Sequence, residues 1–225
     1  AIGCRSFMPR TIRIIVVAFA VGCAVALMVW ISRQRQQQRL VVEVRIPSIM
    51  ATETLLKATV SAGNEQRGRQ ALQAAEAALR QVDATMSTWV GATELSKFNA
   101  APANTIVPLS VATLEVLATA GRFAEQTGGA FDATCRPLLE LWKRCEQEDR
   151  EPTAEEIAQN QARVGWRHIR LHDSTGEKLI TGVEVDLGGI AKGYAVDAAV
   201  RAMRSAGAAG GMVQCGGDLR IFGES

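Results

Sequence analysis

Five apolar residues in the first half of the chain recur at intervals of three or four positions: Leu72, Ala75, Leu79, Val82 and Met86. This spacing places them on one face of an α-helix, because 3.6 residues complete one helical turn. The pattern predicts an amphipathic helix that begins near Gln66 and runs to about Met86.

Two segments ahead of this helix alternate with the period of a strand. Leu40–Ile46 reads LVVEVRI, and Glu53–Ala62 is a second run with β-branched residues, so the folded part is expected to open with strands. Further strands are predicted later in the chain, at Arg167–His172, Lys178–Asp186, Gly211–Gln214 and Leu219–Phe222.

Three more helices are predicted from their start and stop signals. The first two begin at a serine or threonine that can cap the N-terminal amides, and all three end before a glycine. They run from Ser110 to the Gly128-Gly129 stop, from Thr153 to just before Gly165, and over Ala191–Ser205. Together these elements predict a single α+β domain without an internal repeat.

Residues 14–31 (IIVVAFAVGCAVALMVWI) contain no charged side chain. At about 1.5 Å per helical residue the segment spans roughly 27 Å, close to the hydrocarbon thickness of a bilayer. Arginines flank it on both sides in equal number, so they do not set its orientation. We expect a transmembrane anchor or a signal segment here.

This apolar segment divides the chain into four parts. Residues 1–13 form a basic N-terminal segment, residues 14–31 the anchor or signal segment, residues 32–39 (SRQRQQQR) a polar linker, and residues 40–225 the folded domain. Ala24-Val25-Ala26 has the small-x-small form of a signal-peptidase site, and Ala20-Val21-Gly22-Cys23 approximates a lipoprotein box. Retention, cleavage and lipidation of the segment are therefore three open alternatives.

The overall composition is that of an ordinary globular protein. Of 225 residues, 48% are hydrophobic and 21% charged, and 25 basic against 23 acidic residues leave a net charge of +2. Because six of the arginines flank the apolar segment instead of forming a face that could follow a nucleic-acid backbone, nucleic acid is not an expected partner. The five cysteines include no CxxC pair; Cys135 and Cys145 are either a disulfide pair or free thiols.

The stretch from Glu184 to Asp197, EVDLGGIAKGYAVD, combines a carboxylate, two glycines and a lysine. Asp186 is expected at the end of a strand, and Lys192 falls in the first turn of the next helix. A cation at this positive end of the helix dipole costs a few tenths of a kcal/mol, whereas a bound phosphate would be favoured by the exposed amides, the dipole and the lysine. On spacing alone, an anion site and a plain strand-turn-helix with a solvated lysine are equally well supported.

Three other stretches are candidates for a ligand site, and each has a simpler structural explanation. Gly128–Thr134 (GGAFDAT) brings an aromatic and a carboxylate after a helix stop, but a capping loop with an Asx turn accounts for most of it. Trp89, in MSTW, is either a stacking platform or a core residue. Gly216-Gly217-Asp218 is most simply a hairpin turn.

His168 and His172 lack companions that would complete a metal set, and are expected at an edge or on the surface. The sequence contains neither GxSxG nor HExxH, so a hydrolase triad is not supported.

Taken together and in order, four stretches resemble the ApbE family of FAD:protein FMN transferases. They are MSTWVGATELSKFNA (Met86–Ala100), GGAFDATCRPLLELW (Gly128–Trp142), VDLGGIAKGYAVDAAVRAM (Val185–Met203) and VQCGGDLRIFG (Val213–Gly223). The resemblance extends from about Ile49 to Ser225. It implies a single α+β flavin-transferase domain that holds FAD in a cleft beside Mg²⁺, here preceded by the N-terminal transmembrane helix.

The resemblance also implies roles for individual residues. Asp186 and Lys192 are expected to contact FAD and to act in catalysis, and the backbone carbonyl of Gly189 is expected to reach the magnesium ion. Further FAD contacts are implied for Met50, Trp89, Ala130, Phe131 and Asp132.

The implied reaction is a Mg²⁺-dependent phosphoryl transfer. It moves the FMN half of FAD to a threonine, or sometimes a serine, hydroxyl of a partner protein and releases AMP. The partner is expected to be a subunit of a membrane redox complex, and the catalytic domain is expected on the periplasmic side of a bacterial inner membrane. Two alternatives are a membrane-anchored flavin-binding accessory protein without transferase activity, and a structural scaffold whose glycine motifs are only turns.

The sequence departs from the family pattern at three points. Ala51 follows Met50 where the family usually has glycine, and Trp89 stands where the family usually has tyrosine. A stretch like H-I-x-D-P-x-T-G, whose Asp and Thr complete the metal site in the family, has no match up to Ser225. The sequence therefore predicts a C-terminally incomplete domain, with weak FAD binding and no transfer by the printed chain.

Overall fold

The structure covers the folded domain and part of the segment before it. The computed structural model describes residues 21–31, 38–88 and 91–223. The basic segment 1–13, residues 14–20 of the predicted anchor and most of the polar linker lie outside these ranges, and residues 21–31 are helical. No helix in the described ranges is long and apolar enough to cross a membrane, so the anchor stays a prediction.

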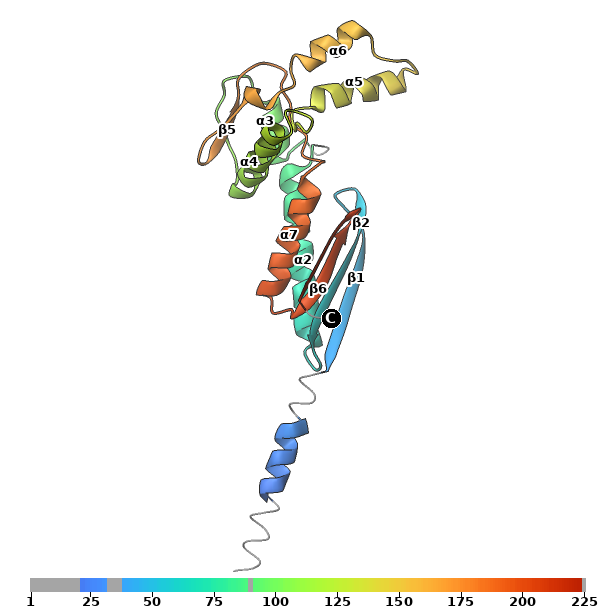
Figure 1. Cartoon of the computed structure of the whole chain (residues 1–225), viewed down its shortest axis with the longest axis vertical. Coiled ribbons are helices and arrows are strands. Elements are labelled where there is room, and N and C mark those ends of the chain that lie inside the picture. The colour runs from blue at the N-terminus through green and yellow to red at the C-terminus, as the bar shows by residue number, and fades with distance from the viewer. Residues whose placement is uncertain (1–20, 32–37, 89–90, 224–225) are drawn as a thin grey trace, which may run out of the picture.

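A four-stranded antiparallel sheet in the order β1-β2-β6-β7 forms one layer of the domain (Figure 1). Leu56 of β2 pairs with Val44 of β1 on one side and with Val213 of β6 on the other. The strands predicted at the two ends of the domain sequence therefore lie next to each other in space. Their bounds are Arg39–Ile49 (β1), Thr52–Ser61 (β2), Gly210–Cys215 (β6) and Asp218–Gly223 (β7).

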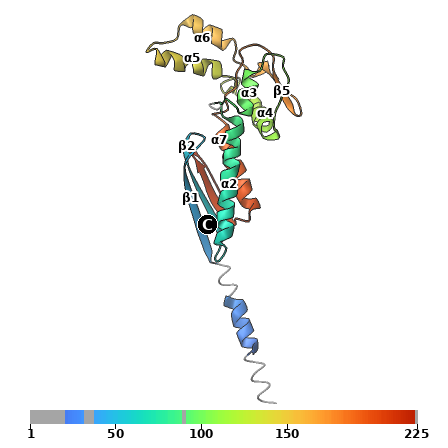
Figure 2. The same ribbon diagram turned by 180° about the vertical axis from the view of Figure 1, so that it is seen from behind.

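Two helices, α2 (Glu65–Met86) and α7 (Ala191–Ser205), lie side by side against one face of this sheet (Figures 1 and 2). The apolar face predicted for α2 is buried throughout, which confirms that helix, and α7 has the predicted bounds. Small side chains let the two helices and the sheet approach closely. Ala75 of α2 and Ala195 and Ala199 of α7 are completely buried.

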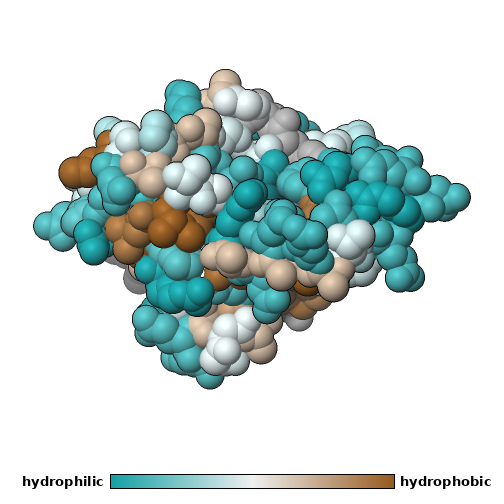
Figure 3. All heavy atoms as spheres, turned by 90° about the horizontal axis from the view of Figure 1, so that it is seen from above, coloured by the Kyte–Doolittle hydropathy of each residue, from teal (hydrophilic) through white to brown (hydrophobic). Residues whose placement is uncertain are grey.

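The other end of the molecule carries the remaining elements (Figure 1). Helix α5 projects from it together with α6, and seen from above this projecting end is almost entirely hydrophilic (Figure 3). Arg150 at its tip pairs with Glu148 and Glu156 at 2.6 and 2.8 Å. The elements are α3 (Glu94–Ala100), α4 (Val111–Gln126), α5 (Arg136–Gln147), α6 (Ala154–Gln161), and a small sheet of β3 (Val107–Pro108), β5 (Thr175–Lys178) and β4 (Ile169–Leu171).

Several predicted elements differ from those observed. The strand predicted over Lys178–Asp186 is wrong: β5 ends at Lys178, and the chain then turns through Gly182, whose φ is 82°. The helix predicted up to Gly165 already ends at Gln161. A 3₁₀ turn, Trp166–His168, replaces the start of the strand predicted at Arg167, and only β4 remains of it.

Two smaller predictions concern a turn and the thiols. Gly216 and Gly217 form the predicted hairpin turn between β6 and β7, where Cys215 pairs with Asp218. Cys135 and Cys145 are both free thiols. The structure therefore has no disulfide between these two residues, which was the other alternative left open by the sequence.

Candidate functional site

A cavity of about 350 Å³ lies where the β1–β2 turn, the end of α2 and the start of α7 meet. Its size is in the range of small-molecule sites. Apolar side chains and backbone form most of the wall, and three charged side chains, those of Asp83, Asp186 and Lys192, reach it. The full lining is Ser48, Met50, Ala51, Asp83, Met86, Ser87, Thr88, Asp186, Leu187, Gly188, Ala191 and Lys192.

The β1–β2 turn brings Met50 to the cavity through an unusual backbone conformation. Met50 and Ala51 both have positive φ angles, 51° and 58°, a region that side chains other than glycine rarely adopt. The backbone N–H of Met50 donates to Oδ2 of Asp83, at 3.2 Å. Asp83 at the end of α2 therefore holds this strained turn against the cavity.

The first turn of α7 borders the same cavity through Ala191 and Lys192. Its N-cap residue is Ile190, which provides no side-chain cap. The N–H of Ala191 donates to the Leu187 carbonyl at 2.7 Å, so of the amides that helices leave unpaired at this end, those of Lys192 and Gly193 remain for a ligand. Lys192 is the second residue of the helix, as predicted, and lines the cavity. No ion pair joins Lys192 to another residue in the described part of the chain.

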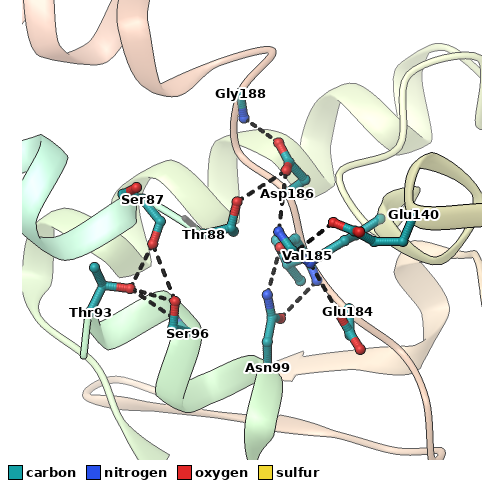
Figure 4. A network of polar contacts seen from close by, with 11 residues as sticks. Ser87, Thr88, Thr93, Ser96, Asn99, Glu140, Glu184, Val185, Asp186 and Gly188 are labelled. Carbon is teal, nitrogen blue, oxygen red and sulfur yellow. Dashed lines mark hydrogen bonds and ion pairs between the residues drawn. The ribbon is translucent and has the colours of Figure 1, made fainter. Parts of the chain in front are cut away.

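Asp186 is held by three groups from different segments (Figure 4). Its Oδ1 accepts a hydrogen bond from the backbone N–H of Gly188 at 2.7 Å, and its Oδ2 accepts one from the Thr88 hydroxyl at 3.3 Å. Nη1 of Arg136 lies 3.7 Å from the same Oδ2. A Cβ at position 188 would lie 2.9 Å from Asp186 Oδ1, so any larger residue there would displace this carboxylate.

The chain just before Asp186 is fixed by one isolated parallel bridge, between Glu184 and Cys135, and by the side chain of Asn99 (Figure 4). The amide of Asn99, on α3, donates to the Val185 carbonyl and accepts from the Val185 N–H, each at 2.8 Å. Lys178, whose pKa is lowered by burial, donates to the Asn99 carbonyl. On the other side, the N–H of Asp186 donates to the Ala133 carbonyl at 2.7 Å.

A second cavity, of about 640 Å³, borders Asp186 and Gly188 as well. Asp186 and Gly188 therefore line both cavities. The ring of Phe131 reaches so close to Gly189 that a Cβ at position 189 would lie 3.3 Å from its Cε2 atom. Ala130, Phe131, Asp132, Gly188 and Gly189 line this second cavity, together with Gly129, Ala133, Cys135, Leu138, Leu139, Gln161, Val164 and Asp186.

The carboxylate of Asp132 is fully engaged in holding the loop. Its Oδ1 accepts hydrogen bonds from the backbone N–H and the hydroxyl of Thr134, at 2.8 and 2.7 Å, and its Oδ2 accepts one from the N–H of Trp166 at 2.9 Å. The Asx turn anticipated in this stretch is thus present. Asp132 lines the second cavity, and its carboxylate shapes that cavity by holding the backbone around Phe131 in place.

Cys135 is a half-buried thiol on the wall of the second cavity. Burial raises the pKa of this thiol, and the nearby negative charges of Asp186 and then Asp132 add to the effect. The thiol therefore stays protonated at neutral pH and is a weak nucleophile.

The structure brings together most of the site residues predicted from the sequence. Met50, Asp186 and Lys192 line the first cavity, and Ala130, Phe131, Asp132 and Gly189 line the second. Trp89 lies outside the described residues. Sequence reasoning missed Asp83, Thr88, Asn99 and Arg136; the last three fall within stretches that carry the family resemblance, but nothing in their spacing indicated a role.

Comparison with known proteins identifies the family of this chain. The ApbE family model matches residues 50–225. The FAD:protein FMN transferase of Haemophilus influenzae is 38% identical over 160 residues, which are 67% of this chain and 45% of that relative. For the FAD:protein FMN transferase of Vibrio cholerae the identity is 36% over 147 residues, or 64% and 44% of the two chains. The chain thus spans about half the length of the curated relatives it matches.

Solved structures show the same fold. The apo form of the Pseudomonas stutzeri flavinyl transferase ApbE superimposes with a TM-score of 0.73 at 29% identity, over 84% of this chain and 60% of that one. The flavin transferase ApbE from Vibrio cholerae gives a TM-score of 0.73 at 30% identity, over 84% and 61%. With its family match over most of its length and this shared fold, the chain belongs to the ApbE family.

Proposed function

We propose that this domain binds FAD and serves in transferring its FMN half to a hydroxyl group of a partner protein. This proposal rests on one cavity, which Lys192 lines together with Asp186 and Met50. The first turn of α7, which has no side-chain cap, borders the same cavity. A pyrophosphate is the anion that such a combination of amides, dipole and ammonium favours. The family relatives named FAD:protein FMN transferase support the same reaction.

The shape of the site fits a long ligand with flat rings and a charged middle. Two cavities of about 350 and 640 Å³ both border Asp186 and Gly188. Apolar side chains, among them Met86 in one cavity and Phe131 in the other, are suited to ring systems. Lys192 lines the first of these cavities, where it could bind the phosphates of a dinucleotide.

In the proposed reaction the acceptor hydroxyl oxygen attacks the phosphorus atom of the FMN half. A new P–O bond to the acceptor forms, the P–O bond to the AMP half breaks, the hydroxyl proton is released, and AMP leaves. Lys192 and the N-terminal amides of α7 would offset the charge that builds on the phosphate oxygens in the transition state. Asp186 would orient the bound nucleotide from the opposite wall.

The described residues do not by themselves form a magnesium site. They contain no group of three or more His, Cys, Asp or Glu side chains that could hold a metal, and both Asp186 oxygens already accept hydrogen bonds. The carbonyl of Gly189 is the one oxygen that we assign to the ion in this proposal.

Partner and location are part of the same proposal. The acceptor would present a threonine or serine, and a subunit of a membrane redox complex is the candidate. The apolar segment 14–31 would anchor the chain in a bacterial inner membrane, with the domain on the periplasmic side, because its length and lack of charge suit a bilayer. Protease accessibility of the domain in intact spheroplasts tests this placement.

Replacement of Lys192 by alanine tests the proposed reaction. The test uses a longer version of the protein that also carries a stretch like H-I-x-D-P-x-T-G. In that version we expect Lys192→Ala to lower the rate of AMP release and of covalent flavin labelling of the acceptor by about 100-fold or more, because a charge-stabilising group is removed. Lys97→Ala, on the exposed side of α3, is the matched control and should keep the parental rate. Chromatography of AMP and in-gel flavin fluorescence measure both products.

Two outcomes would contradict the proposal. An unchanged rate in Lys192→Ala would remove the lysine from the reaction. Flavin that binds tightly while neither AMP nor labelled acceptor forms would favour the flavin-binding accessory protein instead.

A further inference from the structure

Arg136 is the cation nearest to Asp186 among the ion pairs of the described residues. It is the first residue of α5, and its side chain is only 18% exposed. Its three nitrogen atoms face three carboxylates: Nη1 lies 3.7 Å from Asp186, Nε 3.0 Å from Glu184 and Nη2 3.2 Å from Glu140. Arg136 therefore links the carboxylates of Glu140, Glu184 and Asp186, which are labelled in Figure 4.

We propose that Arg136 is a positioning residue that serves as the counterion of Asp186, so that the ammonium group of Lys192 stays free for the anionic part of the ligand. The nature of that ligand rests on the proposed function, whereas the pairing of the charges does not. The two cations at the site would then have separate tasks: Arg136 holds the protein's own carboxylate, and Lys192 binds the phosphate.

The shape of the guanidinium group suits this task. Arginine presents its donors in a rigid planar fork and can serve several carboxylates at once, which the single ammonium of lysine does less well. Because Thr88 and Gly188 fix the remaining directions around the Asp186 carboxylate, the ion pair with Arg136 completes its orientation. The carboxylate is then aligned before a ligand enters.

Without Arg136 the balance of charges at the motif changes. Asp186 would keep Glu184 and Glu140, which also pair with Arg136, as charges of the same sign without the cation that they share. Lys192 lines the same cavity as Asp186 and is the cation that could replace Arg136. An ammonium group paired with Asp186 is no longer available to a phosphate.

The reactivity of Lys192 tests this inference without any ligand. In the whole purified chain, brief labelling with acetic anhydride followed by mass spectrometry reports how freely each lysine amine reacts. We expect Arg136→Gln to slow labelling of Lys192 by about two- to fivefold, the change that corresponds to a partly exposed ion pair. Lys97 provides an internal reference on the exposed side of α3.

Three further variants separate a positioning role from general damage. Arg144→Gln is the matched control, since Arg144 lies on the same helix and pairs with Glu156 at 3.6 Å; Lys192 should label at the parental rate. Arg136→Lys should restore much of the rate. Asp186→Asn added to Arg136→Gln should restore it fully, because the competing carboxylate is gone.

One result overturns the inference independently of how well the Arg136 variants fold. If Asp186→Asn alone speeds labelling of Lys192 in the otherwise unchanged protein, Lys192 is already paired with Asp186, and Arg136 does not keep it free. Equal labelling in Arg136→Gln and the parental chain overturns it as well.

Flavin binding then distinguishes this inference from the proposed function. Titration of FAD, followed by quenching of its fluorescence, should show weaker binding in Arg136→Gln by about the same factor, with no such loss in Arg144→Gln. A parental chain that binds no FAD would contradict the proposed function, while the labelling result would still decide the role of Arg136. FAD binding that is equal in Arg136→Gln and the parental chain would contradict the inference alone.

Discussion

Two consecutive residues in the β1–β2 turn adopt a backbone conformation that glycine prefers. Ala51 has a φ of 58°, and the left-handed conformation costs an L-residue about 1–2 kcal/mol. The cost is tolerated here because the turn places Met50 and Ala51 on the wall of the cavity and because Asp83 holds the Met50 amide.

Replacement of Ala51 by glycine should therefore stabilise the protein. We expect Ala51→Gly to raise the free energy of unfolding by about 0.5–1 kcal/mol, after the larger chain entropy of glycine in the unfolded state is subtracted. Urea denaturation measures the change. Ala77→Gly, at an exposed position inside α2, should instead lower the free energy by about 1 kcal/mol, and an equal loss in both variants would disprove the strain at Ala51.

The thiol of Cys135 reports the charge on Asp186. Its pKa is raised first by burial and then by the carboxylate of Asp186, so less thiolate forms at a given pH and alkylation should be slow at pH 8. Asp186→Asn removes the second cause, and the midpoint of the pH–rate profile with iodoacetamide should move to lower pH. Mass spectrometry of the Cys135 peptide follows the reaction, with buried Cys145 and Cys215 as unreactive references. A profile that stays in place would show that the charge of Asp186 does not reach the thiol.

At the scale of elements, the site depends on a short connection between β5 and α7 that belongs to neither. Residues 183–186 run as an extended segment without a regular strand beside them. Asn99 bonds to both backbone groups of Val185, and Gly188 turns back to Asp186. These contacts allow an irregular segment to hold a carboxylate in a fixed place.

At Gly188, in this connection, the addition of a single methyl group should change both stability and ligand binding. In Gly188→Ala the new Cβ would lie 2.9 Å from Asp186 Oδ1, and the hydrogen bond from the 188 amide would be strained or lost, at a cost of about 1.5–3 kcal/mol. A lower free energy of unfolding together with weaker FAD binding is the expected result. Gly217→Ala is the matched control, since a Cβ at position 217 has no neighbour within 4 Å; equal behaviour of the two variants would argue against the close approach at 188.

At the scale of the whole molecule, the large sheet is covered by helices on one face. Residues on its other face remain in contact with solvent: the side chains of Leu219 and Ile221 on β7 are 54% and 67% exposed, and Val41 on β1 is exposed as well. Exposed apolar side chains that lie next to each other form a hydrophobic patch, to which an apolar dye can bind.

Polar residues on this face should change the surface without changing the fold. We expect the double variant Leu219→Thr and Ile221→Thr to bind clearly less of the dye ANS while its circular dichroism and unfolding midpoint stay close to the parental values, because surface changes usually cost less than about 0.5 kcal/mol each. Phe222→Thr, at the next position but buried, should lower the midpoint markedly. Unchanged dye binding in the double variant would show that this face is not the main exposed apolar surface.

The sequence-based predictions were most accurate where the residues that specify an element lie close together in the chain. The bounds of α7 were predicted correctly because the helix start and its glycine stop lie within a few residues of each other. Helix α5 was missed because only Pro137, Leu141 and Cys145 are buried on it, while exposed Trp142 obscures the pattern of an amphipathic helix.

The wrong strand over Lys178–Asp186 has a different cause. Val183 and Val185 are buried in alternation, which is the pattern of a strand, but the groups that satisfy the backbone at Val185 come from the Asn99 side chain. Alternating apolar residues indicate that a segment is buried on one side. They do not indicate whether a neighbouring strand or a side chain forms hydrogen bonds with its backbone.

The sequence by itself determined the order of most elements, the α+β class, and the placement of Lys192 in the first turn of a helix behind Asp186, because these depend on residues close together in the chain. Only the tertiary structure decided which groups surround that motif. Asn99 and Arg136 reach it from α3 and α5, and Asp83 on α2 holds the β1–β2 turn that lines the same cavity. Both cavities border the motif because the chain brings the β1–β2 turn and the loop around Phe131 close to it. Contacts between such distant segments follow from the path of the whole backbone, which local spacing does not specify.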